Sequence, residues 1–250
     1  MIGGMNVFLK GLLALSACAA FTAHAQPRFE NTLSERLRAC TVCHGEQGRA
    51  GPDGYYPRLA GKPAGYLYNQ MLNFREGRRH YRLMGQLMEP LSDAYLWEIA
   101  HYFADMDLPY PAPTPANATA AQRARGEELV RHGDAARGVP SCAACHGETL
   151  TGRLPHVPGL LGLPRDYLNG QLGAWRTGQR RAHTPDCMAR VAQQLGDDDV
   201  AAVTAWLSSQ AVPPGAKPQN AAPLPPDLAC GSATPPTAAA QSSAAAGGRP

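Results

Sequence analysis

Two short segments of the chain share the same arrangement of cysteine and histidine. They read CTVCH at residues 40–44 and CAACH at residues 142–146. Two thiols at this spacing can form thioether bonds to both vinyl groups of one porphyrin, and the adjacent histidine can then bind the iron. The motifs predict two covalently attached haem c groups, with His44 and His146 as iron ligands. The thiols that would hold the haems are Cys40, Cys43, Cys142 and Cys145.

Two other kinds of site use paired cysteines, and neither fits this spacing. Zinc ribbons bring their two cysteine pairs together within about twenty residues, whereas these pairs are 102 residues apart. A thioredoxin-like redox pair needs a context in which strands alternate with helices, and the sequence has no such pattern. Haem attachment is therefore favoured over zinc binding and over thiol redox chemistry.

The segments that follow the two motifs repeat each other. Residues 55–79 read YYPRLAGKPAGYLYNQMLNFREGRR, and residues 156–180 read HVPGLLGLPRDYLNGQLGAWRTGQR. At an offset of 101 residues, proline, leucine, glycine, tyrosine, glutamine and arginine recur at matched places. Residues 91–106 and 195–210 also parallel each other. The chain is therefore predicted to contain two copies of one haem domain.

The repeat also indicates a second iron ligand in each half. Met188 is the only methionine of the second half, and it precedes Leu195 by seven residues. In the first half Met84 precedes Leu91 by the same seven residues, whereas Met88 precedes it by three. We expect Met84 and Met188 to be the ligands, with Met88 as the alternative in the first half. A thioether favours ferrous iron, and six-coordinate iron has no open position for a substrate, which suits a carrier of single electrons.

Export from the cytoplasm is predicted from the N-terminus. Lys10 precedes a short apolar run, and Ala-His-Ala then gives a cleavage site that would make Gln26 the first mature residue. Two alternatives remain open, an uncleaved anchor and a lipoprotein cleavage box, LSAC, that would leave Cys18 lipidated. Export places the protein in the periplasm, an oxidising compartment. The formal net charge of +3 and the lack of a basic run argue against nucleic-acid binding.

Two cysteines belong to neither haem motif nor the signal sequence. Cys187 and Cys230 are left when Cys18 and the four motif cysteines are set aside from the total of seven. Two remaining thiols in an oxidising compartment are predicted to form a disulfide. Residues 211–230 contain too many prolines to fold alone, so this disulfide would hold a Pro-rich strap across the second domain.

Apolar spacing of three and four residues predicts helices over residues 64–76 and 166–177. Acidic residues near their starts indicate the last helix of each half, over residues 94–106 and 198–209. Residues 33–40 and 120–132, which lead into the two motifs, are also expected to be helical. No run alternates with a period of two, so we expect an all-α protein in which short helices wrap each haem. The predicted organisation is a signal peptide (1–25), a first cytochrome c domain (26–106), a Pro-rich linker (107–119), a second cytochrome c domain (120–210), the Pro-rich strap (211–230) and a disordered tail (231–250).

The tandem pattern resembles the two-haem cytochrome c4 family. The pattern consists of the CxxCH motifs, YPRLAG, YL, a glutamine, an arginine, the methionine and LSD, and it covers residues 32–210. The resemblance implies two class I cytochrome c domains related by a pseudo-twofold axis and a periplasmic electron carrier near the membrane surface. It also implies that the carbonyls of Pro57 and Pro158 accept from the iron-bound imidazoles, a bond that fixes the ring and its tautomer. The second half departs from it, because Gly159 stands where the first half has Arg58.

The resemblance implies redox proteins as partners: a terminal oxidase, a quinol–cytochrome c reductase or a dehydrogenase. Two alternatives stay open, an electron-transfer subunit of a periplasmic dehydrogenase and a dihaem enzyme such as a thiosulfate dehydrogenase, which needs an open iron position. His80 and His183 lie close before the methionines, but we expect surface positions for them. Candidates for contacts with haem edges or propionates, with helix packing as the alternative, are Tyr66, Gln70, Arg79, Tyr167, Gln171 and Arg180.

Overall fold

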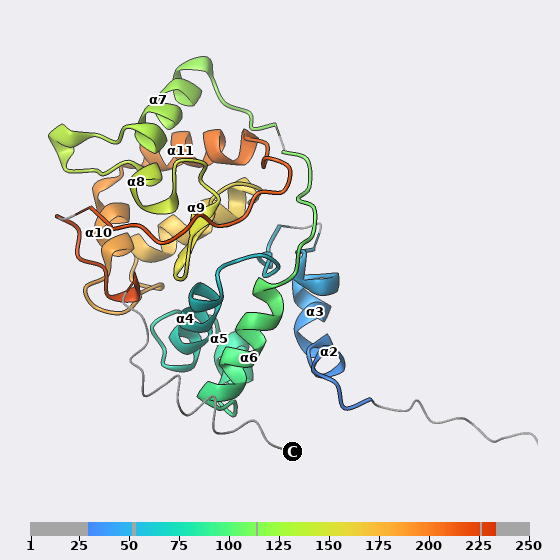
Figure 1. The fold of residues 1–250 in the computed structure, drawn as a ribbon. Helices are drawn as coiled ribbons and strands as arrows, with labels where there is room; N and C mark the ends of the chain where they lie inside the picture. Colours follow the sequence, from blue (N-terminus) through green and yellow to red (C-terminus); the bar gives the residue numbers. More distant parts are fainter. Residues whose placement is uncertain (1–29, 52–53, 114, 226, 234–250) are drawn as a thin grey trace, which may run out of the picture. The chain divides into compact units, whose positions relative to one another are not determined.

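The computed structural model describes residues 30–51, 54–113, 115–225 and 227–233 (Figure 1). Helices dominate these residues, and the strands among them are two residues long each. None of the described helices is long and apolar enough to cross a lipid bilayer. The predicted signal peptide, Cys18 and residues 234–250 of the predicted tail lie outside the described residues.

The helix predicted over residues 33–40 is two helices in the structure. Helix α2 (Leu33–Arg36) begins after Thr32, whose side-chain oxygen accepts a hydrogen bond from the Glu35 amide at 3.2 Å. It ends at Arg36 with Leu37 as its C-cap, and α3 (Arg38–His44) begins at the next residue. Because α3 continues to His44, the first haem motif is helical throughout. A thiol pair three residues apart on one helix lies on one face, which is the arrangement that porphyrin attachment needs.

Three helices build the core of the first repeat. Helix α4 (Ala64–Arg75) packs against α5 (Arg82–Met88) and α6 (Asp93–Ala104). Ser92 caps α6 by accepting from the Tyr95 amide at 3.3 Å. Leu96 and Phe103 are buried on α6, and burying one large apolar side chain stabilises a fold by roughly 1.5–3 kcal/mol. These helices thereby fix the segment that carries Met84.

The second repeat uses the same order of elements, with α7 (Ala120–Arg131), α8 (Cys142–His146), α9 (Arg165–Arg176), α10 (Cys187–Gln194) and α11 (Asp197–Ser209). Thr119 and Gln122 form a capping box at the start of α7. Helix α7 approaches α11 so closely that a Cβ at Gly126 would collide with the carbonyl of Ala202. The core beneath it includes Leu129, Val203 and Trp206.

Several short elements were not predicted from the sequence. Among them are helices α5 and α10, which carry the candidate methionines. A short hairpin, β1 (Gly152–Arg153) and β2 (Val157–Pro158), pairs Gly152 with Pro158 and Arg153 with Val157 in antiparallel register. Strands of two residues are too short to produce an alternating pattern, so the sequence could not indicate them.

The Pro-rich linker is held by the first repeat. Arg58 donates through Nε to the Ala60 carbonyl at 3.0 Å, through Nη1 to the Pro109 carbonyl at 3.1 Å and through Nη2 to the Leu108 carbonyl at 2.5 Å. Its guanidinium carbon also lies 4.0 Å from the centre of the Tyr110 ring. Arg58 therefore anchors the linker, a role that its position in the sequence motif did not indicate.

Candidate haem-binding sites

His44 is the last residue of α3 and is buried. Its Nδ1–H donates to the carbonyl of Pro57 at 2.8 Å, which leaves Nε2 as the nitrogen available to a metal. Burial lowers the pKa of His44, and the nearby charge of Arg79 adds to this effect against the opposing hydrogen bond to Pro57. The ring is therefore neutral and oriented, as an iron ligand must be.

His146 occupies the matching place in the second repeat. It ends α8, a helix capped by Ser141, whose hydroxyl accepts from the Ala144 amide at 3.1 Å. Its Nδ1–H donates to the carbonyl of Pro158 at 2.7 Å. Burial lowers the pKa of His146 to about 4, so the imidazole is neutral at physiological pH. Both histidines thus present Nε2, and both use a proline carbonyl to fix the tautomer.

The four motif cysteines form no disulfide in the structure. Cys40 and Cys43 lie on α3, and Cys142 and Cys145 lie on α8. Within the described residues, no group of three or more His, Cys, Asp or Glu side chains is placed to hold a metal ion. Each cysteine pair thus lies on a helix of its own, an arrangement that fits thioether attachment of two porphyrins.

The candidate sulfur ligands differ in burial. Met88 is only 4% exposed and packs in the core, whereas Met84 is part-exposed on the same helix, α5. Met188 is also part-exposed, and it is the second residue of α10. Asp186 caps that helix by accepting from the Ala189 amide at 3.0 Å. Burial of Met88 favours Met84 as the sixth ligand, and the ligand set stays a prediction.

The structure joins Cys187 and Cys230 through a disulfide. This bond links the first residue of α10 to the end of the Pro-rich strap, and the two cysteines are 43 positions apart in sequence. Gly231 extends the contact, because its amide donates to the Pro185 carbonyl at 2.9 Å. The segment next to Met188 is therefore held covalently.

A symmetric cluster of polar side chains joins the two repeats. Arg79 donates to Gln70 at 2.9 Å in its own repeat and to Gln171 at 2.7 Å in the other. Arg180 does the reverse, donating to Gln171 at 2.7 Å and to Gln70 at 3.0 Å. Each arginine also reaches a tyrosine hydroxyl of the opposite repeat at 3.4 Å, and these hydroxyls belong to Tyr167 and Tyr66.

The charges of this cluster are unbalanced. Arg180 is only 5% exposed, and no ion pair joins Arg79 or Arg180 to a carboxylate within the described residues. Burial lowers the pKa of Arg180, and the charge of Arg79 lowers it further. Buried cations need a counter-charge, and each haem c would supply two propionates. The residues present would therefore suit the propionates of bound haem c.

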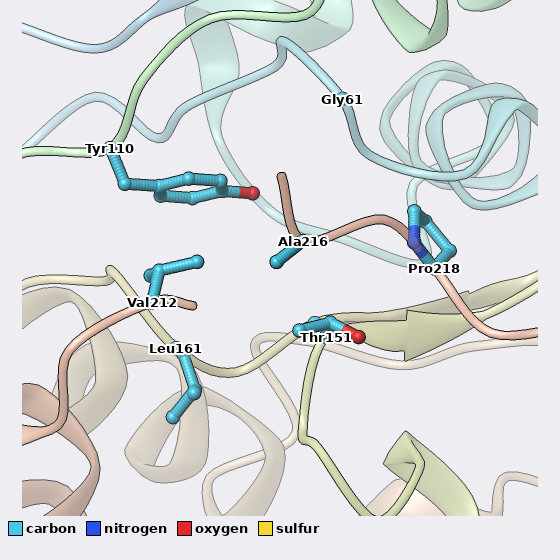
Figure 2. A pocket seen from close by; sticks show the side chains of 8 residues that line it. Gly61, Tyr110, Thr151, Leu161, Val212, Ala216 and Pro218 are labelled. Carbon is cyan, nitrogen blue, oxygen red and sulfur yellow. The ribbon is translucent and has the colours of Figure 1, made fainter. Parts of the chain in front are cut away.

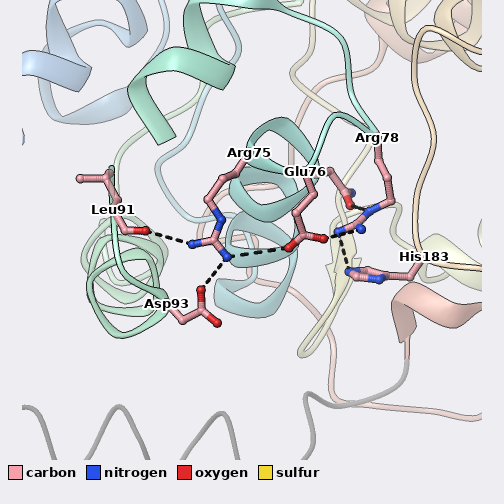
Figure 3. Close-up of polar contacts among 7 residues, drawn as sticks. Arg75, Glu76, Arg78, Leu91, Asp93 and His183 are labelled. Atoms are coloured by element: carbon pink, nitrogen blue, oxygen red, sulfur yellow. Dashed lines mark hydrogen bonds and ion pairs between the residues drawn. The ribbon is translucent and has the colours of Figure 1, made fainter. Parts of the chain in front are cut away.

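Of the two histidines near the candidate methionines, both expected at the surface, only His80 is exposed. His80 is exposed, and its backbone amide donates to the Gln179 carbonyl at 2.8 Å. His183 is part-buried, and its Nε2 accepts from Nη2 of Arg78 at 3.3 Å (Figure 3). Figure 3 also shows Arg78 donating to Glu76, which in turn pairs with Arg75. His183 thus has a protein hydrogen-bond partner for its ring.

Comparison with known proteins identifies the family. The Cytochrome c family profile matches residues 124–211. A relative from Pseudomonas aeruginosa, named cytochrome c4, is 33% identical over 199 residues, which cover 79% of this chain and 92% of the relative. The chain belongs to the cytochrome c4 family. The solved structure of reduced recombinant cytochrome c4 from Pseudomonas stutzeri also matches, with a TM-score of 0.61 and 30% identity over 70% of this chain and 95% of that chain.

A further relative of this cytochrome c4 family member has a more specific name. It is called thiosulfate dehydrogenase electron acceptor, comes from Thiomonas intermedia (strain K12), and is 36% identical over 177 residues. These residues cover 70% of this chain and 80% of the relative.

Membership of the cytochrome c4 family confirms three sequence predictions. The chain is a dihaem electron carrier, it takes two covalently attached haem c groups, and its fold is the all-α class I cytochrome c fold. When bound, haem c supplies an iron that alternates between the ferric and ferrous states and so holds one electron. The carbonyls of Pro57 and Pro158 orient the two imidazoles that would bind these irons.

Sequence reasoning missed one buried cation in this cytochrome c4. Lys62 is buried, and its ammonium donates to the carbonyl of Gly159 in the other repeat at 3.0 Å. Burial lowers the pKa of Lys62 to about 8, with a further contribution from Arg58. The repeat gave no signal for this contact, because Leu163 is the matched residue in the second half.

Proposed function

We propose that this cytochrome c4 is a periplasmic carrier of single electrons between respiratory redox proteins and is not itself an enzyme. His44 and Met84 bind the first iron, and His146 and Met188 bind the second. Cys40 with Cys43 and Cys142 with Cys145 form the thioether bonds. Two side-chain ligands on each iron leave no position for a small-molecule substrate. The protein partners are therefore redox proteins, and a terminal oxidase is the expected final acceptor.

The polar cluster of Arg79 and Arg180 carries this proposal. Its hydrogen bonds link matched residues of the two repeats. Its excess positive charge would be balanced if the propionates of both haems lay beside it. Two haem sites that share one cluster lie close enough to exchange electrons internally, which suits a carrier that takes electrons from one protein and delivers them to another.

Carbon monoxide binding tests the claim that neither iron is open. We expect the ferrous holoprotein to bind no carbon monoxide at neutral pH, because methionine occupies the sixth position of each iron. The Met188→Ala variant serves as the positive control and should bind one equivalent. Wild-type protein that binds one equivalent per chain would show an open iron, and an enzymatic role would then replace the carrier role.

A dehydrogenase as electron donor is a second candidate function, favoured by the name of the Thiomonas intermedia relative. The ferric protein can be mixed with thiosulfate alone and with thiosulfate plus a purified thiosulfate dehydrogenase. Reduction only when the dehydrogenase is present would make this chain its acceptor. Reduction by thiosulfate alone would make the chain an enzyme. If the haems are reduced in neither mixture, the protein is a respiratory carrier that receives its electrons from a different donor.

Export to the periplasm rests on the predicted signal peptide at residues 1–25. Cleavage after Ala25 would give a mature chain that begins at Gln26, and the alternative lipoprotein cleavage would leave a lipid on Cys18. The intact mass of the protein purified from the periplasmic fraction distinguishes the two forms. An uncleaved N-terminus in the cytoplasmic fraction would contradict export, which haem attachment also requires.

A further inference from the structure

The Pro-rich strap runs along the segment that follows the second haem motif. The amide of Gln219 donates to the Gly152 carbonyl at 2.8 Å, and its carbonyl accepts from the Leu154 amide at 2.8 Å. Thr151 donates through its hydroxyl to the Lys217 carbonyl at 2.9 Å. The strap thus adds to β1 by backbone pairing rather than by side-chain contacts alone.

The side chain of Gln219 reaches the haem motif itself. Gly147 follows His146 directly and has a φ of +87°. A Cβ at Gly147 would collide with the side-chain amide of Gln219. The strap therefore packs directly on the backbone beside the histidine predicted to bind the second iron.

The strap then reaches the helix that carries Met188. Arg190 donates to the Asp227 carbonyl at 3.2 Å, Leu228 is buried, and the disulfide follows at Cys230. Haem attachment involves α8, and the predicted sixth ligand comes from α10. Because the strap contacts residues next to both, it lies across the side of the second site between these two segments.

Contacts with the first repeat and the linker fix both ends of the strap. Near its beginning, Val212, Ala216 and Pro218 surround a pocket together with Tyr110 of the linker (Figure 2). Lys217 pairs there with Asp107 at 2.7 Å. Beyond its end, the Ser232 carbonyl accepts from Asn69 of α4 at 3.1 Å. The strap is therefore a fixed part of the fold.

The matched surface of the first repeat is open. Val42, between the two cysteines of the first motif, is 84% exposed, and Leu83 and Leu87 beside Met84 are 43% and 44% exposed. At the repeat-matched places the second half has Ala144, the disulfide-bonded Cys187 and a part-buried Val191. Val42, Leu83 and Leu87 are thus more exposed than the residues at the matched places of the second half, although Leu154 in the hairpin of the second half is also 44% exposed.

We propose that the strap covers the second haem site against other proteins, so that redox partners exchange electrons through the first site. The proposal rests on the carrier function. The partner is a redox protein whose cofactor lies beneath an apolar surface, and it docks on Leu83 and Leu87. Arg82 stands beside Leu83, exposed and without an ion pair in the described part of the chain. This unpaired cation favours a partner with acidic groups around its apolar surface.

The test measures the rate at which the ferrous holoprotein reduces an oxidised blue copper protein. Each iron gives one electron to one copper, so one holoprotein reduces two copper proteins. Leu87→Glu should lower the second-order rate constant about tenfold, within the range that interface changes produce. Gln193→Glu places the same charge on the exposed face of α10 and should leave the rate unchanged. Opening the strap with Cys187→Ser and Cys230→Ser should create a second route, so that Leu87→Glu then lowers the rate only about twofold.

Two results would overturn the proposal. One is an unchanged rate for Leu87→Glu in the intact protein, and the other is an undiminished tenfold loss after the strap is opened. The methionine–iron absorption band shows whether the serine variant keeps its methionine ligands. If it does not, the double variant Asn69→Ala with Arg190→Ala is used instead, because it removes two contacts of the strap and leaves both cysteines in place. Carbon monoxide binding by the wild type would defeat the carrier function separately, whatever these rates show.

Discussion

Arg79 and Arg180 pair as an isolated antiparallel bridge through their backbones, and both guanidinium groups donate to the same two glutamines, Gln70 and Gln171. On either side of this bridge, the His80 amide donates to Gln179 and the Arg181 amide donates to Arg78. Equivalent residues of the two repeats thus meet each other. Two like charges held this close repel each other, and the propionates of bound haem c would offset that repulsion.

Replacement of Arg180 should lower the reduction potential of the second haem. A buried positive charge near the iron stabilises the extra electron, so Arg180→Gln should lower this potential by about 60 mV, equivalent to a tenfold change in the equilibrium constant. Arg181→Gln is the matched control, because Arg181 is exposed and adjacent in sequence. Spectra recorded during a redox titration measure both. A lowered potential in the control and not in Arg180→Gln would contradict the assignment of this cluster.

Substitution of the methionines separates the two candidates in the first repeat. Met84→Ala should remove about half of the methionine–iron absorption band, since one of two ligands is lost. Met188→Ala should remove the other half. Met88→Ala should keep the full band but lower the free energy of unfolding by about 2–5 kcal/mol, because it leaves a cavity in the core. If Met88→Ala loses the band while Met84→Ala keeps it, the repeat-based assignment is wrong.

Two aspartates of the second repeat should make its stability depend on pH. Hydrogen bonds from Arg125 and then Arg137 lower the pKa of Asp134 to about 2. Burial raises the pKa of Asp199, but hydrogen bonds from Arg137 and Arg125 outweigh it and leave this pKa below its ordinary value. A carboxyl with a lowered pKa stabilises the fold above its unfolded pKa, about 4, and that stability is lost as the pH falls through the folded pKa.

The variant Asp199→Asn should therefore reduce the free energy of unfolding by about 1 kcal/mol at pH 7, a figure reduced for the partial exposure of both arginines. The difference from wild type should shrink as the pH falls below about 4, the pKa of an unfolded aspartate. Asp198→Asn is the control, because Asp198 lies in the same first turn of α11 but is exposed. Denaturant unfolding at several pH values gives the comparison. If both variants change the free energy of unfolding equally at every pH, the contacts of Asp199 with the two arginines do not contribute to stability.

The disulfide gives a prediction of its own. Denatured, non-reduced holoprotein should take up no alkylating reagent, because four cysteines are bound to haem and two to each other. The double serine variant, Cys187→Ser with Cys230→Ser, should lose about 4 kcal/mol of stability for a loop of this length. Two alkylated cysteines in the wild type would show that the strap is not covalently held.

The sequence was most informative where the chemistry restricts residue spacing. The two CxxCH motifs identified the haem sites because thioether formation tolerates few arrangements, and the repeat then pointed to Met84 and Met188. It was less informative where tertiary packing decides the structure. Helices α5 and α10 are short, and their length depends on packing and on the Asp186 cap rather than on a long apolar period.

Contacts without a repeat counterpart could not be predicted. Lys62 reaches Gly159 in the other repeat, and Arg58 holds the linker carbonyls, because the folded backbone brings distant segments together. The count of cysteines outside the haem motifs and the signal sequence predicted the disulfide that joins the strap to Cys187. The pairing of Gln219 with β1 had no signal, since a single glutamine in a proline-rich segment does not indicate a strand.

The spin and ligation state of the ferric holoprotein at rest tests the central claim most directly. Electron paramagnetic resonance, combined with a haem count on the same sample, should show two covalently bound haems per chain, both low-spin, with a methionine absorption band for each. A high-spin ferric signal at rest, or fewer than two haems per chain, would contradict the account of two closed sites built for carrying electrons.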